Sequence, residues 1–416
     1  MRVRNFVLDT IRSVFESFGF EPLETPSLEY ASTLLGKYGK EADRLVYTFK
    51  DRGGREVGLI YDLTVPVSRV LAIYGKKIPL PFKRYQIQRV WRAEKPQKGR
   101  FREFVQCDFD IFGVDSPLAD AEIIAVIYQV LKKLNFNDFK IRINSRPLLF
   151  SVLEESGITG KNQQLEVLRT IDKLGKVPQQ KLIEELKKKG LVNLTNDRLF
   201  NKIQVTRPNE EITKILNYLQ AMGLEEKYYC FDPTLVRGLD YYTGPIFEAV
   251  IGDSSNSVAG GGRYDNLIEQ LGGPPIPATG ASLGLDRLCE LVKEKNFLKE
   301  NLKPAADALV TVFPTSQVSN VGLTPPSTCE VEKLEAEALK LVAEVRAANI
   351  NTEIYLGPAA KLDKQIKYAD RKGVPYVLIL GPEEAKSNTV TIKSLKTGEQ
   401  EAVRRDQITT KLKIQN

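Results

Sequence analysis

Residues 83–113 read KRYQIQRVWRAEKPQKGRFREFVQCDFDIFG, and this stretch decides the fold of the larger part of the chain. Apolar and polar side chains alternate on both sides of Lys95–Gly99, a polar segment with the Pro and Gly of a turn. Because successive side chains of a strand point to opposite faces, each run has one largely apolar face and one polar face. The stretch therefore predicts a long antiparallel hairpin.

The polar face of this hairpin has an unusual composition. It consists of Gln88, Val90, Arg92, Glu94, Arg100, Arg102, Phe104, Gln106, Asp108 and Asp110. An antiparallel sheet with one wet face explains the alternation by itself. However, wet faces are usually rich in Lys, Glu and Thr, whereas arginine binds phosphates through two hydrogen bonds and stacks on flat rings. Arg92, Arg102 and Phe104 therefore predict a nucleotide-binding surface.

The segments before the hairpin predict a helix followed by extended structure. Apolar residues recur at helical spacing in residues 3–18. Two prolines make residues 20–29 extended, and residues 46–63 have the pattern of a second hairpin. Thr64 is expected to cap the helix that follows, with Pro66 in its first turn.

The segments after the hairpin change from helical to strand patterns and back. Ser116 and Pro117 predict the start of a helix, and residues 147–225 are helical in pattern and rich in lysine. Strand patterns return near residues 228–231 and 246–251. A last strand–helix unit is expected at residues 278–291, and the charged residues 293–306, which include Pro304, are typical of a linker. Beyond it, strands expected at 308–313, 352–356 and 376–380 alternate with helices at 331–348 and 361–372, which predicts a separate small α/β domain.

The composition excludes several classes of chemistry. The chain has 416 residues, a net charge of +7 and no histidine, so it cannot contain a Ser-His-Asp triad, a His-ligated zinc ion or an imidazole base. Its four cysteines are far apart, which favours free thiols in a reducing compartment. No apolar run approaches the roughly 20 residues needed to span a membrane. The length predicts two or three domains.

Four motifs resemble those of a known family. Residues 92–104, RAEKPQKGRFREF, resemble motif 2 of class II aminoacyl-tRNA synthetases. Residues 235–248, LVRGLDYYTGPIFE, are similar to the histidine-binding signature of histidyl-tRNA synthetases. Residues 280–287, GASLGLDR, are similar to motif 3, and Thr25–Pro26 fits motif 1. The resemblance to the histidyl-tRNA synthetase family extends from residue 1 to the C-terminus, although family members usually carry a short segment before the first helix.

The resemblance implies a class II synthetase-like fold. Its parts would be an α+β catalytic core with a mainly antiparallel sheet (residues 1–146 and 226–293), a helical insertion domain (147–225), a linker (294–306) and a C-terminal α/β anticodon-binding domain (307–416). The family activates L-histidine with ATP to histidyl-adenylate and transfers it to the 3′ end of tRNA(His). The cofactors implied are ATP and Mg²⁺, the latter on the β- and γ-phosphates; the sequence shows no metal-binding site made of protein groups alone.

The resemblance also implies roles for individual residues at the nucleotide. Arg92 would bind the α-phosphate, and Arg237 would lie on the other side of the same phosphate. Arg287 would stack on the adenine opposite Phe104 and reach the γ-phosphate. The remaining contacts are implied for Glu94 (the adenine edge) and for Arg100 and Arg102 (the phosphates).

The amino-acid subsite is implied in the same way. Asp62 and Thr64 resemble the segment that binds the α-amino group, and Gln106 would hold the backbone of the amino acid. Asp110 and Tyr242 would bind the two imidazole nitrogens, one of which donates a hydrogen bond while the other accepts one. The pocket would be completed by Tyr241, Tyr264 and the backbone of Gly260–Gly262. Each of these residues also has an ordinary structural explanation when it is considered alone.

The remaining implications concern tRNA, assembly and location. Lys181 and Lys187–Lys189 resemble the insertion that contacts the acceptor stem, although a solvated helix face is the better explanation of any single lysine. The turn at Lys95–Gly99 is placed to read the acceptor end. Lys361–Arg371 is a candidate surface for the anticodon, although a plain amphipathic helix explains it equally well. The family implies a homodimer in the cytoplasm with no membrane association.

Two other functions are compatible with a chain of this kind. Non-catalytic paralogues of histidyl-tRNA synthetases act as regulatory subunits, but sensor-type copies usually lose the catalytic arginines or the histidine signature, which this chain keeps. A class IIa synthetase for another amino acid is the second alternative, and the RGLDYY run at residues 237–242 argues against it.

Overall fold

The computed structural model divides the chain into two compact units, Met1–Glu300 and Asn301–Asn416. It describes residues 1–37, 43–95, 101–174, 177–189, 198–236, 241–252, 257–295, 304–312, 328–357 and 361–414. Each unit has its own large sheet and its own buried apolar residues.

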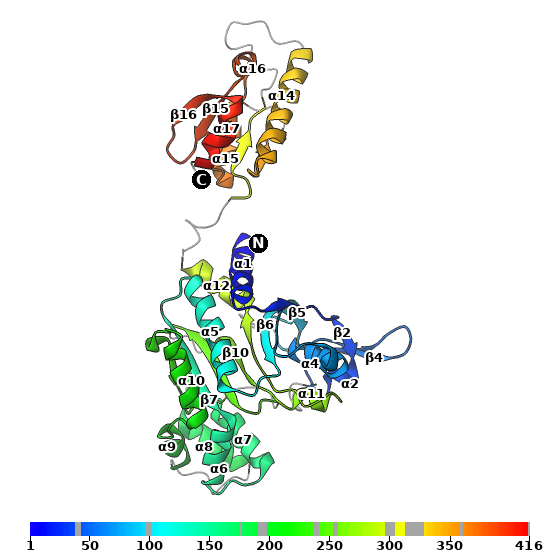
Figure 1. Cartoon of the computed structure of the whole chain (residues 1–416), viewed down its shortest axis with the longest axis vertical. Coiled ribbons are helices and arrows are strands. Elements are labelled where there is room, and N and C mark those ends of the chain that lie inside the picture. Colours follow the sequence, from blue (N-terminus) through cyan, green and yellow to red (C-terminus); the bar gives the residue numbers. More distant parts are fainter. Residues whose placement is uncertain are drawn as a thin grey trace. The chain divides into compact units, whose positions relative to one another are not determined.

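An eight-stranded sheet forms the centre of the larger unit (Figure 1). Its strands, in spatial order, are β1 (Glu21–Pro22), β5 (Phe82–Trp91), β6 (Glu103–Phe112), β11 (Ala278–Gly284), β10 (Ser257–Arg263), β9 (Pro245–Ile251), β7 (Phe139–Ser145) and β8 (Tyr229–Phe231). The pairs β1–β5 and β7–β8 at the two edges are parallel, and all the other pairs are antiparallel. The predicted mainly antiparallel sheet is confirmed.

Strands β5 and β6 are the predicted hairpin. Arg84 pairs with Asp110, Gln88 with Gln106, and Val90 with Phe104, so the predicted polar face lies on one side of the sheet. The tip of the hairpin, residues 96–100, lies outside the described part of the chain.

The apolar face of the hairpin is covered by three helices, α1 (Arg2–Ser17), α5 (Pro117–Lys133) and α12 (Leu285–Glu294) (Figure 1). Phe15 of α1 packs against Phe109 with ring centroids 4.7 Å apart and against Tyr85 at 5.4 Å. Ser116 caps α5 by accepting a hydrogen bond from the backbone N–H of Leu118 (3.2 Å), as predicted. Burying this face leaves the polar face for other contacts.

The polar side of the sheet is partly covered by α4 (Thr64–Tyr74) and α11 (Leu267–Gln270). Thr64 does not cap α4, so that prediction was wrong. The helix begins at Thr64 itself, and the Asp62 carboxylate accepts the backbone N–H of Val65 at 3.0 Å. A carboxylate just before the first turn can reach an unpaired N–H group and interacts well with the positive end of the helix dipole.

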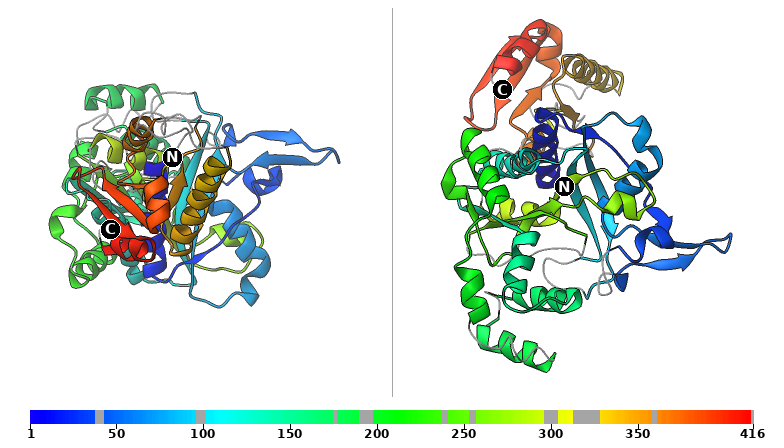
Figure 2. Two further views of the ribbon diagram at one scale, coloured as in Figure 1. Left: turned by 90° about the horizontal axis from the view of Figure 1, so that it is seen from above. Right: turned by 60° about the horizontal axis from the view of Figure 1, so that its bottom comes forward.

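A small antiparallel sheet lies beside α4. It comprises β2 (Leu28–Tyr30), β4 (Glu56–Leu59) and β3 (Thr48–Lys50), with the short helix α2 (Ala31–Leu34) packed on it. The β3–β4 hairpin projects from the unit in both views of Figure 2. A 3₁₀ turn, Gly75–Lys77, follows α4.

The segment between β7 and β8 is helical in its described residues, as its pattern predicted. It contains α6 (Arg146–Glu154), α7 (Lys161–Ile171), α8 (Gln179–Lys188), α9 (Arg198–Gln204) and α10 (Glu210–Ala221), followed by the 3₁₀ turn Glu226–Tyr228. Helices α6 to α9 gather at one end of the unit in Figure 1, and their apolar side chains form a separate cluster. Helix α10 packs on α5 and so lies against the main sheet.

The smaller unit has a five-stranded sheet. Its order is β13 (Thr352–Ile354), β12 (Ala308–Val310), β14 (Tyr376–Ile379), β15 (Thr389–Ser394) and β16 (Gln400–Arg404). The first three strands are parallel and alternate with α14 (Thr328–Ala347) and α15 (Leu362–Lys372), which confirms the predicted βαβαβ pattern. Antiparallel β15 and β16, with α16 (Pro382–Ser387), the 3₁₀ turn Arg405–Gln407 and α17 (Ile408–Ile414), were not predicted.

Within the described ranges, no helix combines the length and apolar character needed to cross a membrane.

Candidate active site

The polar side of the sheet contains a cavity of about 230 Å³. Its walls come from the loop before α4, the hairpin strands, the segment after residue 240 and strands β10 and β11. The lining residues are Asp62, Thr64, Arg92, Gln106, Asp108, Asp110, Tyr241, Tyr242, Gly260, Tyr264, Gly280, Ala281 and Ser282.

Most of the residues assigned to histidine binding from the sequence meet in this cavity. Seven of the eight line it: Asp62, Thr64, Gln106, Asp110, Tyr241, Tyr242 and Tyr264. The eighth, Arg237, lies outside the described residues. These residues are separated by as many as 202 positions in the chain, from Asp62 to Tyr264, so only the folded sheet brings them together.

Asp110, one of the lining residues, is held from two sides. Its side chain is buried, its Oδ1 accepts a hydrogen bond from the Tyr264 hydroxyl, and its Oδ2 lies 2.7 Å from Nη2 of Arg84. Burial raises the pKa of Asp110, while the Arg84 guanidinium and the Tyr264 hydrogen bond act in the opposite direction. Burial likewise raises the pKa of Tyr264 well above its ordinary value, so its hydroxyl stays protonated.

Asp108 is a cavity residue that the sequence assignment missed. It is buried, and its Oδ1 accepts a hydrogen bond from Nε2 of Gln106 at 3.2 Å. Burial raises the pKa of Asp108 to about 7, despite the nearby cation of Arg84. The signal was present in the sequence, because Asp108 shares the alternation that placed Gln106 and Asp110 on one face.

Strand β11 supplies the other residues that were missed. Ser282 accepts a hydrogen bond from Nε2 of Gln106 at 2.9 Å, and Gly280 and Ala281 line the cavity beside it. Sequence reasoning treated this segment only as part of motif 3. The pairing of β11 with β6 could not be read from either strand alone.

The aromatic wall is formed by three tyrosines. The rings of Tyr241 and Tyr242 meet edge to face at 4.9 Å, and Tyr241 lies 5.8 Å from Tyr264. The Tyr241 hydroxyl donates to Oδ2 of Asp62 at 3.5 Å. Burial raises the pKa of Tyr241 well above its ordinary value, so this wall offers neutral hydroxyl donors beside the Asp62 carboxylate.

Arg92 brings a cation to the cavity. Its guanidinium carbon lies 4.2 Å from the centroid of the Tyr61 ring and 5.0 Å from that of Phe104. Its Nε donates to the backbone oxygen of Tyr61 at 3.2 Å, and its Nη2 donates to Oε1 of Gln106 at 3.5 Å. These contacts orient a half-buried cation that can attract an anionic group at the cavity.

The other residues assigned to ATP are not among those that line the cavity. Arg102 is exposed and donates from Nε to the backbone oxygen of Glu94 at 3.2 Å. Phe104 packs at the edge of the apolar cluster, and Arg287 is half-buried on α12. Arg100 lies outside the described residues.

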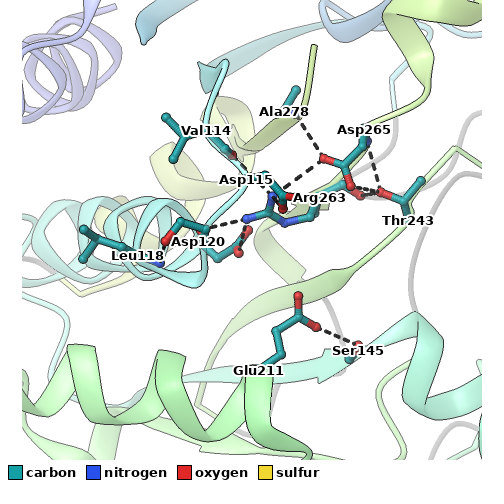
Figure 3. Close-up of polar contacts among 11 residues, drawn as sticks. Val114, Asp115, Leu118, Asp120, Ser145, Glu211, Thr243, Arg263, Asp265 and Ala278 are labelled. Carbon is teal, nitrogen blue, oxygen red and sulfur yellow. Dashed lines mark hydrogen bonds and ion pairs between the residues drawn. The ribbon is translucent and has the colours of Figure 1, made fainter. Parts of the chain in front are cut away.

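A buried ion-pair network supports the tyrosine wall (Figure 3). Arg263, directly before Tyr264, contacts Asp120 of α5 at 2.6 Å and Asp115 at 3.0 Å. Thr243, directly after Tyr242, donates to Oδ2 of Asp265 at 2.8 Å, and its backbone N–H donates to the backbone oxygen of Arg263 at 2.8 Å. The network therefore connects the neighbours of Tyr242 and Tyr264 to α5; nothing in the sequence pattern predicted it.

The described residues do not offer a protein site for a metal ion. No group of three or more Cys, Asp or Glu side chains among them is arranged to hold one.

Comparisons with known proteins show the family of the chain. A family model described as histidyl-tRNA synthetase matches residues 2–288, and a model described as anticodon binding domain matches residues 310–415. The chain belongs to the histidyl-tRNA synthetase family. A histidine–tRNA ligase of Gloeobacter violaceus is 38% identical, with 96% of this chain and 92% of the relative covered. The family resemblance inferred from the four motifs is thereby confirmed.

Two further relatives extend this result. A histidine–tRNA ligase of Aeropyrum pernix is 39% identical, with 97% of this chain and 92% of the relative covered. The crystal structure of a histidyl-tRNA synthetase from a Nostoc species superposes with a TM-score of 0.81 at 27% identity and covers 100% of this chain and 96% of its own. The predicted synthetase-like fold is confirmed.

Proposed function

We propose that the protein activates L-histidine with ATP to histidyl-adenylate and then transfers the histidyl group to the 3′ end of tRNA(His). The observation that carries this function is the convergence of Asp62, Gln106, Asp110 and the three tyrosines on one cavity beside Arg92. Family membership supports the same activity.

The first step requires positioning and charge neutralisation rather than a base. The histidine carboxylate is ionised at neutral pH, and one of its oxygens attacks the α-phosphorus. A new bond forms between this oxygen and the α-phosphorus. The bond between the α-phosphorus and the oxygen that bridges to the β-phosphate breaks, and pyrophosphate leaves with the electron pair of that bond. No proton has to be removed from the nucleophile, which is consistent with a chain that has no histidine residue.

Arg92 is the cation that we assign to the α-phosphate. Its guanidinium is oriented by its contacts with Tyr61 and Gln106, which preorganises the cation for a phosphate. Arg237 is proposed for the opposite side of this phosphate on the basis of the signature alone. We also retain the proposed nucleotide contacts of Glu94, Arg100, Arg102, Phe104 and Arg287.

The amino-acid subsite fits a histidine side chain. Asp110 and the Tyr242 hydroxyl can satisfy the donor and the acceptor nitrogen of an imidazole. Asp62 and Thr64 line the same cavity and suit an ammonium group, and we assign the backbone of the amino acid to Gln106. A buried polar group that is left unpaired costs about 1–3 kcal/mol, so an apolar analogue would bind poorly.

Several wider features belong to the same proposal. As the family resemblance implies, Mg²⁺ would be held by the β- and γ-phosphate oxygens of ATP. We propose a cytoplasmic homodimer with a catalytic core, a helical insertion at 147–225 and an anticodon-binding unit from residue 307. The tRNA contacts proposed are the hairpin turn, the lysines Lys181 and Lys187–Lys189, and Lys361–Arg371.

The test is histidine-dependent ATP–pyrophosphate exchange, followed by charging of tRNA. Exchange with histidine and charging of tRNA(His) are the expected results. A soluble full-length preparation that shows no exchange would favour a regulatory paralogue, and exchange with a different amino acid would favour another class IIa specificity.

A further inference from the structure

Arg84 is a fully buried arginine directly beneath the amino-acid subsite. It lies on β5 opposite Asp110 on β6, and none of its surface is exposed. A buried guanidinium is costly unless it is paired and hydrogen-bonded, so its partners indicate why it is there.

The partners of Arg84 belong to two different parts of the site. Its Nη2 lies 2.7 Å from Oδ2 of Asp110 and donates to the backbone oxygen of Leu63 at 3.3 Å. Leu63 stands between Asp62 and Thr64, the two residues proposed for the α-amino group. One guanidinium therefore connects the segment at the ammonium end of the substrate with the carboxylate at the imidazole end.

The charge of Arg84 also fits this position. Three carboxylates, Asp62, Asp108 and Asp110, line the cavity. The cation of Arg84 lowers the pKa of Asp108 and of Asp110, opposing the effect of burial. A neutral side chain at position 84 would leave two buried carboxyl groups without this compensation.

We propose that Arg84 is a positioning residue for the amino-acid substrate, which holds the Asp110 carboxylate and the Asp62–Thr64 segment at a fixed separation without touching the substrate. This inference rests on the proposed function. It differs from a purely structural role, in which Arg84 would stabilise the sheet but would not influence histidine in preference to ATP.

The test compares Arg84→Met and Arg84→Lys with the wild-type enzyme in the exchange assay. Arg84→Met is expected to raise the KM for histidine about tenfold or more, with the KM for ATP changed less than about twofold. Arg84→Lys keeps the charge, but a lysine ammonium does not reproduce the position of Nη2, which contacts both Asp110 and Leu63, so a smaller rise of about threefold is expected.

The matched control is Arg142→Met. Arg142 on β7 pairs with Asp232 at 2.6 Å and lies outside the cavity, so its loss is expected to leave the KM for histidine unchanged. If Arg84→Met alters the KM for histidine no more than Arg142→Met does, the positioning role is wrong.

The dependence of the KM for histidine on pH separates a positioning role from a purely structural one, because a structural role would leave it unchanged. Without the cation, Asp110 is protonated at a higher pH, so the rise in the KM for histidine on acidification should begin at a higher pH in Arg84→Met than in the wild type. An unchanged profile contradicts the inference.

The experiments distinguish failure of the role proposed for Arg84 from misfolding of a variant and from failure of the proposed function. If Arg84→Met is insoluble, Arg84→Lys decides: a selective rise in the KM for histidine supports the role, and a wild-type value contradicts it. If the wild-type enzyme shows no histidine-dependent exchange, the proposed function fails. If it is active and the Arg84 variants match the control, only the role of Arg84 fails.

Discussion

Gly280 and Asp110 occupy adjoining space so closely that a methyl group on Gly280 would lie 1.8 Å from Oδ1 of Asp110. The two residues are paired across β11 and β6. Because the carboxylate lies over the neighbouring strand, where it also accepts the Tyr264 hydroxyl, that strand must have no side chain at this position. The absence of a side chain at residue 280 is therefore part of the geometry that places Asp110 in the cavity.

Gly280→Ala should displace the Asp110 carboxylate and raise the KM for histidine about tenfold, because a buried hydrogen bond and an ion pair are disturbed together. The KM for ATP should change less. The matched control is Gly284→Ala on the same strand, where the added methyl group would be 3.6 Å from the nearest atom, the backbone oxygen of Val258. Equal values of the KM for histidine in the two variants would contradict the prediction.

Tyr242→Phe removes one hydroxyl group from the wall of the cavity. We expect histidine binding to weaken by about 1 kcal/mol, which raises the KM for histidine roughly fivefold. The KM for ATP should change little. Tyr128→Phe, which removes a hydroxyl 3.4 Å from Glu225 outside the cavity, serves as the control. An unchanged KM for histidine in Tyr242→Phe would remove this residue from the proposed recognition.

Arg92→Ala should slow activation about 10²–10³-fold, because it removes a preorganised cation from the charge that develops on the α-phosphate. Arg237→Ala is expected to have a similar effect on the basis of the signature. Both variants should retain the circular dichroism spectrum of the wild type. Intact exchange rates at saturating substrate would overturn these assignments.

The contribution of Asp108 to stability should fall as the pH rises from about 4 to about 7. Its pKa is 3.8 ordinarily and about 7 in the folded protein, so the folded state holds a proton that the unfolded chain has lost in this range. Asp108→Asn removes this titration, although Asp110, Asp120 and Glu211, whose pKa values are also raised, remain. The contribution of Asp108 is measured by the change in the urea unfolding midpoint from pH 5 to pH 8, and Asp108→Asn should lack the fall in midpoint that Asp108 causes in the wild type. The same change in both proteins would contradict the prediction.

Asp120→Ala should destabilise the larger unit by about 3–5 kcal/mol, because it leaves the Arg263 guanidinium buried without its closest carboxylate. Asp9→Ala breaks an exposed ion pair with Arg12 on α1 and should have little effect. Urea unfolding followed by fluorescence measures both. Similar midpoints for the two variants would show that the network in Figure 3 contributes little to stability.

The places where sequence reasoning failed share a physical cause. Thr64 has the usual chemistry of a helix cap, yet the Asp62 carboxylate takes that place, because the choice between two nearby acceptors depends on how the preceding strand approaches the helix. Ser282 reaches Gln106 only because β11 pairs with β6. The sequence did not indicate the partners of Arg84 and Arg263, since these partners are distant in the chain.

Local geometry explains what the sequence determined by itself. Strand alternation has a period of two, so Gln106, Asp108 and Asp110 had to share one face of the hairpin, and the four motifs are short local runs that indicate the family by their residues alone. The tertiary structure alone decided which residues surround the cavity, which carboxylates are buried enough for a raised pKa, and which guanidinium compensates them. Those properties depend on strand pairing and on exclusion of water, which arise from contacts between residues far apart in the chain.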